Sequence, residues 1–398
     1  MTEWKEKKVS MGGAAIFVVV ALFAGVFVGN NWQGMINDFS VFLGVRKQVA
    51  ALDFSQVDAL YRELKNTFDG EIDPSLAIEG AKRGLVESLG DRYTVFMNAA
   101  EAREFENSLS GDIGAGVGVE LSERDGFVKV IRTLQDNPAR RAGVKAGDII
   151  YKVDGEEVTG LAPESVANKV RGAAGSEVTL TVVRGREELD FKMTREKINN
   201  VSAYVEYSNN TAIITILRFD NDTGNIVKGI ANEINSKGIN SIIVDLRGNG
   251  GGYVNAARDV LSLWIDGDLI MDQRSISGVN NEKYFANRGQ AILRGKKTIV
   301  LTNGTTASAA EIMAGALRDY DQATIVGEKS YGKGSVQVVR ELAGGNRLKV
   351  TIAKWFTPNG VNITGEGIVP DVEVERSFDD INQDRDPQLD RAKQLINE

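Results

Sequence analysis

The hydrophobic positions of the chain change their spacing from one region to the next. An uncharged apolar run extends from Met11 to Gly29 and is just long enough to cross the hydrocarbon core of a bilayer. Within residues 37–107, apolar residues recur every three to five positions, for example between Leu52 and Leu64. This spacing predicts a small helical region.

After residue 107 the pattern becomes strand-like. Short runs such as "GFVKVIR" and "SEVTLTVVRG" lie on either side of one predicted helix, "APESVANKVRG". From residue 198 to 376, predicted strands alternate with predicted helices, as where "INSIIVDLRG" follows "TGNIVKGIANEINSKG". This order predicts a largely parallel sheet covered by helices, so we expect a multidomain α/β protein.

The last segment, residues 377–398, is charged and has few apolar positions. We interpret it as a solvated helix or as a contact onto another subunit. The expected regions are therefore 1–36, 37–107, 108–197, 198–376 and 377–398.

The apolar run within residues 1–36 predicts a single-pass membrane anchor. Lys5, Lys7 and Lys8 precede the run, and no Lys or Arg follows it before Arg46. By the positive-inside rule the N-terminus lies in the cytoplasm and the remainder lies outside. A cleaved signal peptide is the alternative, but the run is longer than a usual signal core and shows no evident small-residue cleavage site. An uncleaved anchor is favoured.

Composition removes several kinds of chemistry. The 398 residues include no cysteine and no histidine, which excludes disulfides, thiolate sites and every Ser-His-Asp arrangement. The net charge is −8, and the short basic clusters carry no interleaved aromatic residues, which argues against a nucleic-acid partner. Any nucleophilic serine in this chain needs a different base, and lysine is the best-attested substitute.

One serine has a suitable local sequence. Ser308, in "TNGTTASAAEI", follows a predicted strand and begins a predicted helix, where unpaired backbone amides and the positive end of the helix dipole favour an oxyanion. The same residues also match a capping box, in which Ser308 and Glu311 satisfy each other's backbone amides. Taken alone, this stretch favours capping.

Lys333 is the candidate base. It stands between two glycines in "SYGKGSVQVV", and glycines allow close approach of another backbone. To act as a base, its pKa must fall from about 10.4 to near 7, which requires burial away from carboxylates. Gln337 lies four residues further on, a spacing that returns to the same face of a strand. An exposed turn lysine is the alternative.

The glycine-rich stretch "DLRGNGGGY" follows the apolar strand "SIIV". Consecutive glycines at the end of a strand can turn a backbone amide toward a ligand, as an oxyanion hole requires. A phosphate cradle is the alternative, but neither Walker spacing nor Gly-x-Gly-x-x-Gly is present.

Taken together, these motifs resemble the C-terminal processing peptidases, or tail-specific proteases, which are serine peptidases with a Ser-Lys dyad. The resemblance extends from about Asp53 onward and rests on "GDRYTVF", the segment Ser110 to Arg195, "DLRGNGGG", "TTASAAEI", "GEKSYGKGSVQ" and "WFTPNGVNITGEGIVPDV". It implies a PDZ-like domain before a crotonase-like ββα peptidase core. It also implies a bacterial enzyme without cofactor or metal, with its catalytic domains on the extracytoplasmic side of the cytoplasmic membrane.

The resemblance assigns roles to particular residues. Ser308 corresponds to the nucleophile, Lys333 to the general base and Gln337 to the residue that positions the lysine. The amides of Gly251 and Ala309 correspond to the oxyanion hole. The family usually has Asn and Pro where this chain has Gly248 and Gly250, which predicts a looser oxyanion loop.

Substrate selection is expected in the PDZ-like segment. The loop "GAGVGV" can present amides to a terminal carboxylate while the adjoining strand edge accepts an extended peptide, so unfolded or tailed proteins are the expected partners. Arg171 matches an arginine that in relatives couples occupancy of this domain to the active site; a solvated helix-end charge is the alternative. The expected peptide-binding residues are Gly116, Val117, Gly118, Val119 and Arg171.

Two other functions are weighed against the peptidase. The chain could be a PDZ scaffold with an inactive peptidase core, although serine, lysine and glutamine are all in register. A crotonase-like acyl-transfer or hydratase enzyme would share the ββα core but has no use for a carboxylate-binding domain. A homodimer is an assembly that the sequence leaves open.

Overall fold

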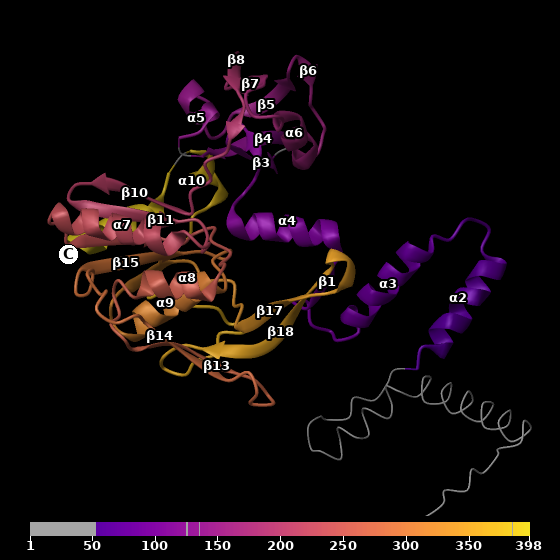
Figure 1. Ribbon diagram of the computed structural model, residues 1–398. Helices are drawn as coiled ribbons and strands as arrows, with labels where there is room; N and C mark the ends of the chain where they lie inside the picture. Colours follow the sequence, from indigo (N-terminus) through magenta and orange to yellow (C-terminus); the bar gives the residue numbers. More distant parts are fainter. Residues whose placement is uncertain (1–52, 125, 135, 384) are drawn as a thin grey trace, which may run out of the picture. The chain divides into compact units, whose positions relative to one another are not determined.

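The computed structural model describes residues 53–398 except residues 125, 135 and 384. The described residues divide into two units between Ala77 and Ile78, and each unit is considered by itself (Figure 1). The predicted anchor lies outside the described residues. No helix in the described part is long and apolar enough to cross a membrane, so the anchor stays a prediction.

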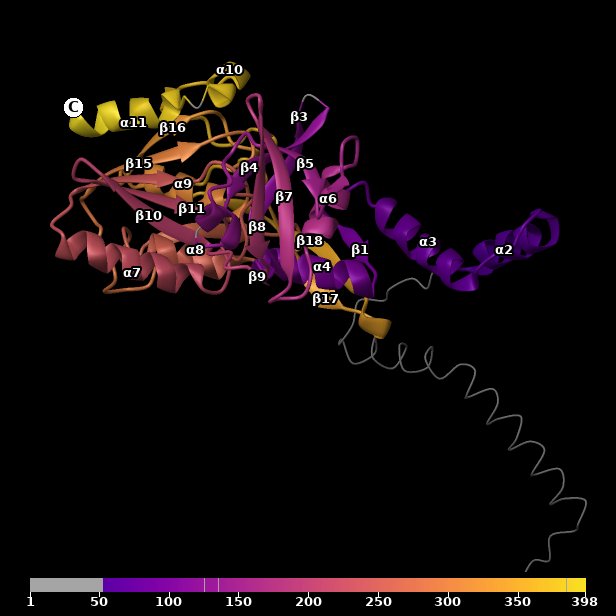
Figure 2. The same ribbon diagram turned by 90° about the horizontal axis from the view of Figure 1, so that it is seen from above.

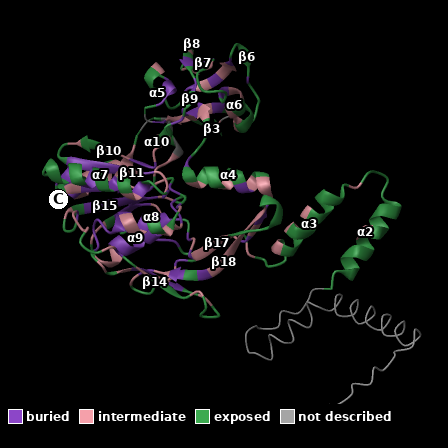
Figure 3. Ribbon diagram, viewed as in Figure 1, coloured by how far each residue is buried: buried purple, intermediate pink, exposed green. Residues whose placement is uncertain are grey.

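In the first unit the principal described element is α2 (Ser55–Thr67), after which α3 (Pro74–Glu87) begins. The helical periodicity is present as predicted, but α2 buries none of its residues. Val57, Leu60 and Leu64 are 49%, 60% and 45% exposed (α2 is green in Figure 3). The described residues of its own unit therefore leave the apolar side of α2 uncovered.

A β-rich domain lies within the second unit, after α4 (Ala99–Ser110). Five of its strands form an antiparallel sheet in the order β3-β4-β5-β7-β8. Buried apolar residues such as Val130, Leu180 and Val182 form its own core. Its elements are β2 (Ala115–Gly116), β3 (Val119–Arg124), β4 (Phe127–Thr133), α5 (Pro138–Ala142), β5 (Ile149–Val153), β6 (Glu156–Glu157), α6 (Pro163–Val170), β7 (Glu177–Arg184), β8 (Glu187–Thr194) and β9 (Glu196–Lys197).

The predicted parallel sheet forms the centre of the α/β core. Its order is β10-β11-β12-β15-β16-β19, and only the β10–β11 pair is antiparallel. Buried parallel strands read as continuous apolar runs, as "SIIVD" does here. Its strands and helices are β10 (Ala203–Ser208), β11 (Thr211–Ile216), α7 (Thr223–Ser236), β12 (Ser241–Asp245), α8 (Val254–Leu261), β15 (Lys297–Thr302), α9 (Ala309–Asp319), β16 (Thr324–Gly327) and β19 (Val372–Glu373).

The two faces of this sheet are covered differently. Ile242 and Val244 point to the side of α7, α8 and α9, while Ile243 points to the other side, where Ala392 and Ile396 of α11 (Pro387–Asn397) cover it. Figure 2 shows α7 and α11 on opposite sides of the strands. This alternation follows from the period of two along a strand.

The charged C-terminal segment thus differs from the expected solvated helix or subunit contact. After α10 (Phe378–Asn382), α11 docks on the sheet of its own chain. Arg247 fixes the connection, because its guanidinium donates to Asp386 at 2.8 Å and pairs with Asp245 at 2.7 Å. The few apolar residues of α11 suffice because they all fall on one face.

A second, largely antiparallel sheet lies beside the core. Its path is β1-β18-β13-β14, and β17 pairs with β18. Val95 of β1 lies opposite Lys349 of β18, so "GDRYTVF" joins a strand far along the chain. The elements are β1 (Val95–Met97), β13 (Leu269–Arg274), β14 (Glu282–Phe285), β17 (Ser335–Glu341), the short helix η1 (Ala343–Gly345) and β18 (Arg347–Phe356).

Candidate active site

Ser308 lies in a tight turn between β15 and α9. Its backbone has φ 56° and ψ −118°, a conformation that costs energy for any residue with a Cβ atom. Such strained residues are concentrated at active sites, where the surrounding structure holds them in place. The following residues Ala309 and Ala310 are fully buried, so only small side chains fit behind the turn.

The capping-box alternative is present in part. Glu311 Oε2 accepts a hydrogen bond from the Ser308 N–H at 2.8 Å. The Ser308 hydroxyl faces the Glu311 amide in the capping arrangement but falls short of a cap hydrogen bond. The geometry of a helix cap and a hydroxyl available for chemistry therefore coexist at Ser308.

Lys333 lies in the loop between β16 and β17. A Cβ atom at Gly332 would stand 2.9 Å from the Gly367 nitrogen, and one at Gly334 would stand 2.5 Å from Thr364 Oγ1. The two glycines therefore allow the close backbone approach that the sequence predicted. The Lys333 carbonyl also accepts from Trp355 Nε1 at 2.9 Å, which fixes the loop.

The surroundings of Lys333 destabilise its charged form relative to that of an exposed lysine. Burial lowers the pKa of Lys333, the nearby positive charge of Lys349 lowers it further, and Glu311 opposes the shift. Within the described part of the chain, the ammonium forms no ion pair within 4.0 Å. A lysine in this state is a better base than an exposed one, because it loses its proton nearer to neutral pH.

The two candidate residues are connected through one carboxylate. Glu311 is fully buried, and its Oε2 accepts from the Lys333 N–H at 3.0 Å as well as from the Ser308 N–H. Its Oε1 accepts from the Ser330 hydroxyl and the Gly332 N–H, both at 2.6 Å. The sequence indicated Glu311 only as a cap.

Gln337 is not bonded to Lys333 among the described residues. Its Nε2 donates to Ser335 Oγ at 2.8 Å and to Thr351 Oγ1 at 3.1 Å. Lys333 lies in the loop before β17 begins at Ser335, so the strand alternation on which the same-face expectation depended does not extend to it. The positioning role of Gln337 stays a prediction.

The glycine-rich loop of residues 248–252, the predicted oxyanion loop, lies against the turn that holds Ser308. A Cβ atom at Gly251 would stand 2.8 Å from Ser308 Cβ and 3.0 Å from the Ala309 nitrogen, so the two backbones touch. Ala309 is the first residue of α9, and its N–H has no intrahelical acceptor. The Gly251 N–H donates to Asn249 Oδ1 at 2.8 Å and is therefore occupied.

Asn249 compensates for the departures at Gly248 and Gly250. Asn249 is fully buried, and its side-chain Nδ2 donates to the Ile216 carbonyl at 2.9 Å. Its backbone carbonyl accepts from the Ala307 N–H at 2.9 Å. The loop is therefore held at its centre despite the two flexible glycines.

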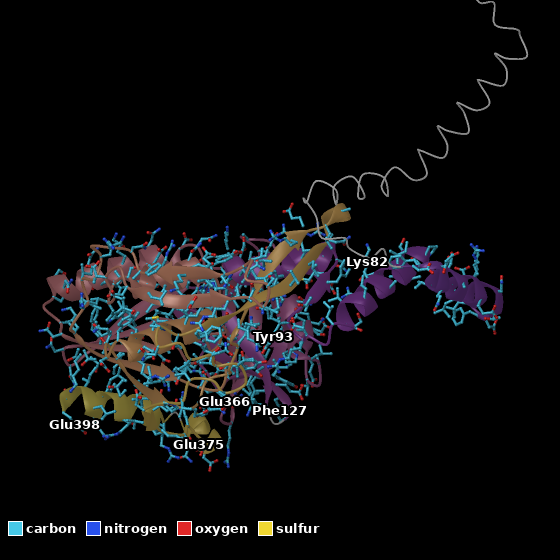
Figure 4. The ribbon with its side chains drawn as sticks, turned by 90° about the horizontal axis from the view of Figure 1, so that it is seen from below. Lys82, Tyr93, Phe127, Glu366, Glu375 and Glu398 are labelled. Atoms are coloured by element: carbon cyan, nitrogen blue, oxygen red, sulfur yellow. The ribbon has the colours of Figure 1, made fainter. Side chains whose placement is uncertain are left out.

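The segment "GDRYTVF", which the sequence analysis named only as part of the family resemblance, reaches the candidate base. The Lys333 Nζ lies 5.5 Å from the centroid of the Tyr93 ring (Tyr93 is labelled in Figure 4). Arg92 donates to the Tyr93 hydroxyl at 2.5 Å and stacks 5.4 Å from the Tyr331 ring. Only the strand pairing of β1 with β18 brings these residues together, so local sequence could not reveal the contact.

The expected peptide-binding residues line one hollow in the β-rich domain. They are Gly116, Val117, Gly118, Val119 and Arg171. Gly116 is already paired with Glu196 of β9. Arg171 ends α6 and bonds within it, to Glu164 at 3.3 Å and Asn168 at 2.8 Å, so its coupling to the core stays a prediction.

Comparison with known proteins identifies the domains that carry these residues. Residues 210–374 match peptidase family S41, and residues 115–194 match the PDZ domain. A probable CtpA-like serine protease of Staphylococcus aureus (strain MSSA476) is 30% identical over 375 residues, covering 94% of this chain and 73% of the relative. The corresponding protein of Staphylococcus haemolyticus is 30% identical over 371 residues, covering 93% and 72%.

Among solved structures, the photosystem II D1 C-terminal processing protease superposes with a TM-score of 0.51 at 27% identity, covering 79% of this chain and 86% of that one. The mixed α/β fold with PDZ and peptidase domains is thereby confirmed, and the hydratase alternative is not supported. The chain belongs to peptidase family S41, as a serine-type endopeptidase that carries a PDZ domain and is related to the C-terminal processing proteases.

Proposed function

We propose that this peptidase cleaves by a Ser-Lys dyad. The neutral Lys333 amine takes the proton of Ser308 as the hydroxyl oxygen attacks a peptide carbonyl, and the departing amine of the substrate takes a proton as the acyl-enzyme forms. Water then hydrolyses the ester and restores both residues. The observation that carries the proposal is a partly buried lysine with a lowered pKa, held by the carboxylate that also holds the Ser308 turn.

The oxyanion would be held by backbone amides. Ala309 supplies one N–H from the first turn of α9, and Gly251 supplies a second when its N–H exchanges Asn249 Oδ1 for the substrate oxygen. Because no histidine exists in the chain, the alternative of a Ser-His base does not arise. An inactive scaffold would have no use for a strained serine and a partly buried lysine whose backbone amides share one buried carboxylate.

Tyr93 offers a test of the base. Replacing Tyr93 with alanine is expected to let water reach Lys333, raise the pKa of the lysine and move the rise of kcat/KM to higher pH. Tyr93→Phe keeps the ring and should leave the profile in place. A wild-type profile for a folded Tyr93→Ala protein would show that the ring does not shield the base.

Substrates are proposed to enter by their C-terminal tails. The hollow beside Gly116 and Val117 would receive the terminal carboxylate on backbone amides, and an extended peptide would add to the edge of β3. A tailed, unfolded substrate with a free C-terminus is expected to be cleaved about tenfold faster than its amidated twin, since the amide lacks the charge-assisted contact. Equal rates for both substrates would show that the enzyme does not recognise the C-terminal carboxylate. They would not contradict its peptidase activity.

Arg171→Ala is the companion variant in that assay. It should slow cleavage of long tailed substrates more than it weakens binding of a short C-terminal peptide, if Arg171 couples domain occupancy to the core. If cleavage of long substrates and binding of the short peptide fall by the same factor, Arg171 acts in binding alone.

The enzyme is further proposed to be anchored by residues 11–29 in a bacterial cytoplasmic membrane, with its catalytic domains outside. The support is the uncharged run and the lysines before it. Protease added to spheroplasts should digest the catalytic domain. Digestion only after lysis would reverse the orientation.

Pairing of two copies through α2 is proposed as the assembly, because Val57, Leu60 and Leu64 form an apolar face that the described residues of their unit leave uncovered. Equilibrium sedimentation of the protein lacking residues 1–36 should show a dimer that Leu60→Asp dissociates. A monomer at all concentrations would contradict it.

A further inference from the structure

Glu311 is more deeply buried than a capping residue needs to be. A helix cap at the surface can keep its carboxylate in water, yet Glu311 has no exposed surface. Burying a carboxylate is costly unless hydrogen bonds replace its water. Here four donors do so, at 2.6 to 3.0 Å.

The donors come from two segments that are separate in the sequence. One is the Ser308 N–H at the start of α9, and the others belong to the loop of Ser330, Gly332 and Lys333. An ionised carboxylate can only accept hydrogen bonds, and here it accepts them from three backbone amides and one hydroxyl. The carboxylate therefore links the turn of the nucleophile to the loop of the base.

The loop of Lys333 is also held by hydrogen bonds that do not involve Glu311. Ser330 Oγ accepts from the Ile368 N–H at 2.6 Å, and the Tyr331 N–H donates to the Thr306 carbonyl at 3.0 Å. These bonds hold the loop to its neighbours. Only Glu311 bonds directly to both Ser308 and Lys333 among the described residues.

We propose that Glu311 is a positioning residue for peptide hydrolysis, which aligns Ser308 and Lys333 by holding both of their backbone amides on one carboxylate oxygen. The proposal rests on the dyad put forward above as the proposed function. Glu311 does not touch the reacting atoms; it sets the distance and direction between them. A misplacement of about 1 Å can cost about 100-fold in rate, which sets the scale of the effect.

Glu311→Gln is the sharpest variant. Glutamine has the same shape, but its amide nitrogen is a donor and would face two of the four N–H or O–H donors. We expect kcat on a tailed, unfolded protein to fall about 100-fold with KM nearly unchanged. Since the negative charge of Glu311 raises the pKa of Lys333, its removal should also move the rise of kcat to lower pH.

That pH shift distinguishes positioning from general loss of structure, because a partly unfolded enzyme loses amplitude without moving its profile. Glu328→Gln is the matched control. Glu328 is a partly buried glutamate on the same connection, but its carboxylate accepts from the Arg376 backbone N–H at 3.2 Å and from Gln388 Nε2 at 3.0 Å, away from the dyad. Its kcat and pH profile should equal those of the wild type.

If Glu311→Gln fails to fold, Ser330→Ala carries the test. It removes one donor and keeps the charge, so we expect a kcat about five- to tenfold lower with the pH profile unmoved. A wild-type kcat and pH profile for the folded variant, Glu311→Gln or in its absence Ser330→Ala, would overturn the positioning role.

The same assay on Ser308→Ala and Lys333→Ala separates this failure from a failure of the dyad. If both dyad variants are inactive while Glu311→Gln is normal, only the positioning role is refuted. If either dyad variant turns over at the wild-type rate, the proposed function is refuted, and with it the alignment that Glu311 is held to provide.

Discussion

Lys333→Ala is expected to lower kcat/KM for an unfolded protein substrate by at least about 1,000-fold, because loss of a nucleophile or its base typically leaves only the contribution of the oxyanion hole and binding. The pKa of Lys333 is lowered chiefly by burial, so its neutral form is available below the usual pH for a lysine. In the wild type, the rate should therefore rise with pH through the pKa of Lys333 and then level off. Steady-state kinetics from pH 5 to 10 measure both.

Lys329→Ala is the control for that experiment. Lys329 is exposed and lies in the connection that leads to Lys333, so it tests a change of net charge without a change at the site. Its kcat/KM should match the wild type. Full turnover by Lys333→Ala, or a chemical step that does not vary from pH 5 to 10, would contradict a titrating lysine base.

Gly251→Ala is expected to cost about 100- to 1,000-fold in kcat, the range for loss of an oxyanion donor. Gly251 has φ 105°, which disfavours a side chain, and its new methyl group would stand 2.8 Å from both the Ala307 carbonyl oxygen and Ser308 Cβ. The oxyanion loop must move away from the nucleophile to relieve this contact. Kinetics on the purified variant measure the loss.

Gly250→Ala is the matched control, one residue earlier in the same loop. A Cβ atom there would meet nothing within 4 Å, so activity should stay within about twofold of the wild type. If Gly251→Ala folds and retains wild-type kcat, the loop does not form the oxyanion hole. If Gly250→Ala is equally inactive, the loop tolerates no substitution and the specific role of Gly251 is unsupported.

The sequence was most informative where local pattern and long-range structure agree. The apolar strand "SIIVD" predicted a buried parallel strand, and β12 is one, with both faces covered. The glycines around Lys333 predicted close backbone approach, and Gly367 and Thr364 supply it. An apolar run has one main structural consequence, which is burial. A missing side chain likewise has one, which is close backbone approach.

It was least informative where strand pairing joins distant segments. The contact of Tyr93 with Lys333 depends on β1 pairing with β18, and nothing in "GDRYTVF" indicates that partner. The start of β17 at Ser335, after Lys333, likewise leaves no mark in the alternating pattern of the sequence. Such features depend on tertiary packing and cannot be predicted from the local sequence.

Glu311 and the C-terminal helix are intermediate cases. The spacing of Ser308 and Glu311 indicated a cap, but the three donors from the loop of Lys333 could not be read from it. The charged C-terminal segment suggested a solvated helix, because its apolar residues are few. Arg247 and the open face of the sheet decide its position.

Covalent labelling can show whether Ser308 is a nucleophile activated by Lys333. A fluorophosphonate probe should modify the wild-type protein once, at Ser308 by peptide mapping, at a rate that rises with pH. Ser308→Ala should take no label, and folded Lys333→Ala should label at least about 100-fold more slowly. Labelling at another residue, or at an unchanged rate in Lys333→Ala, would contradict the dyad.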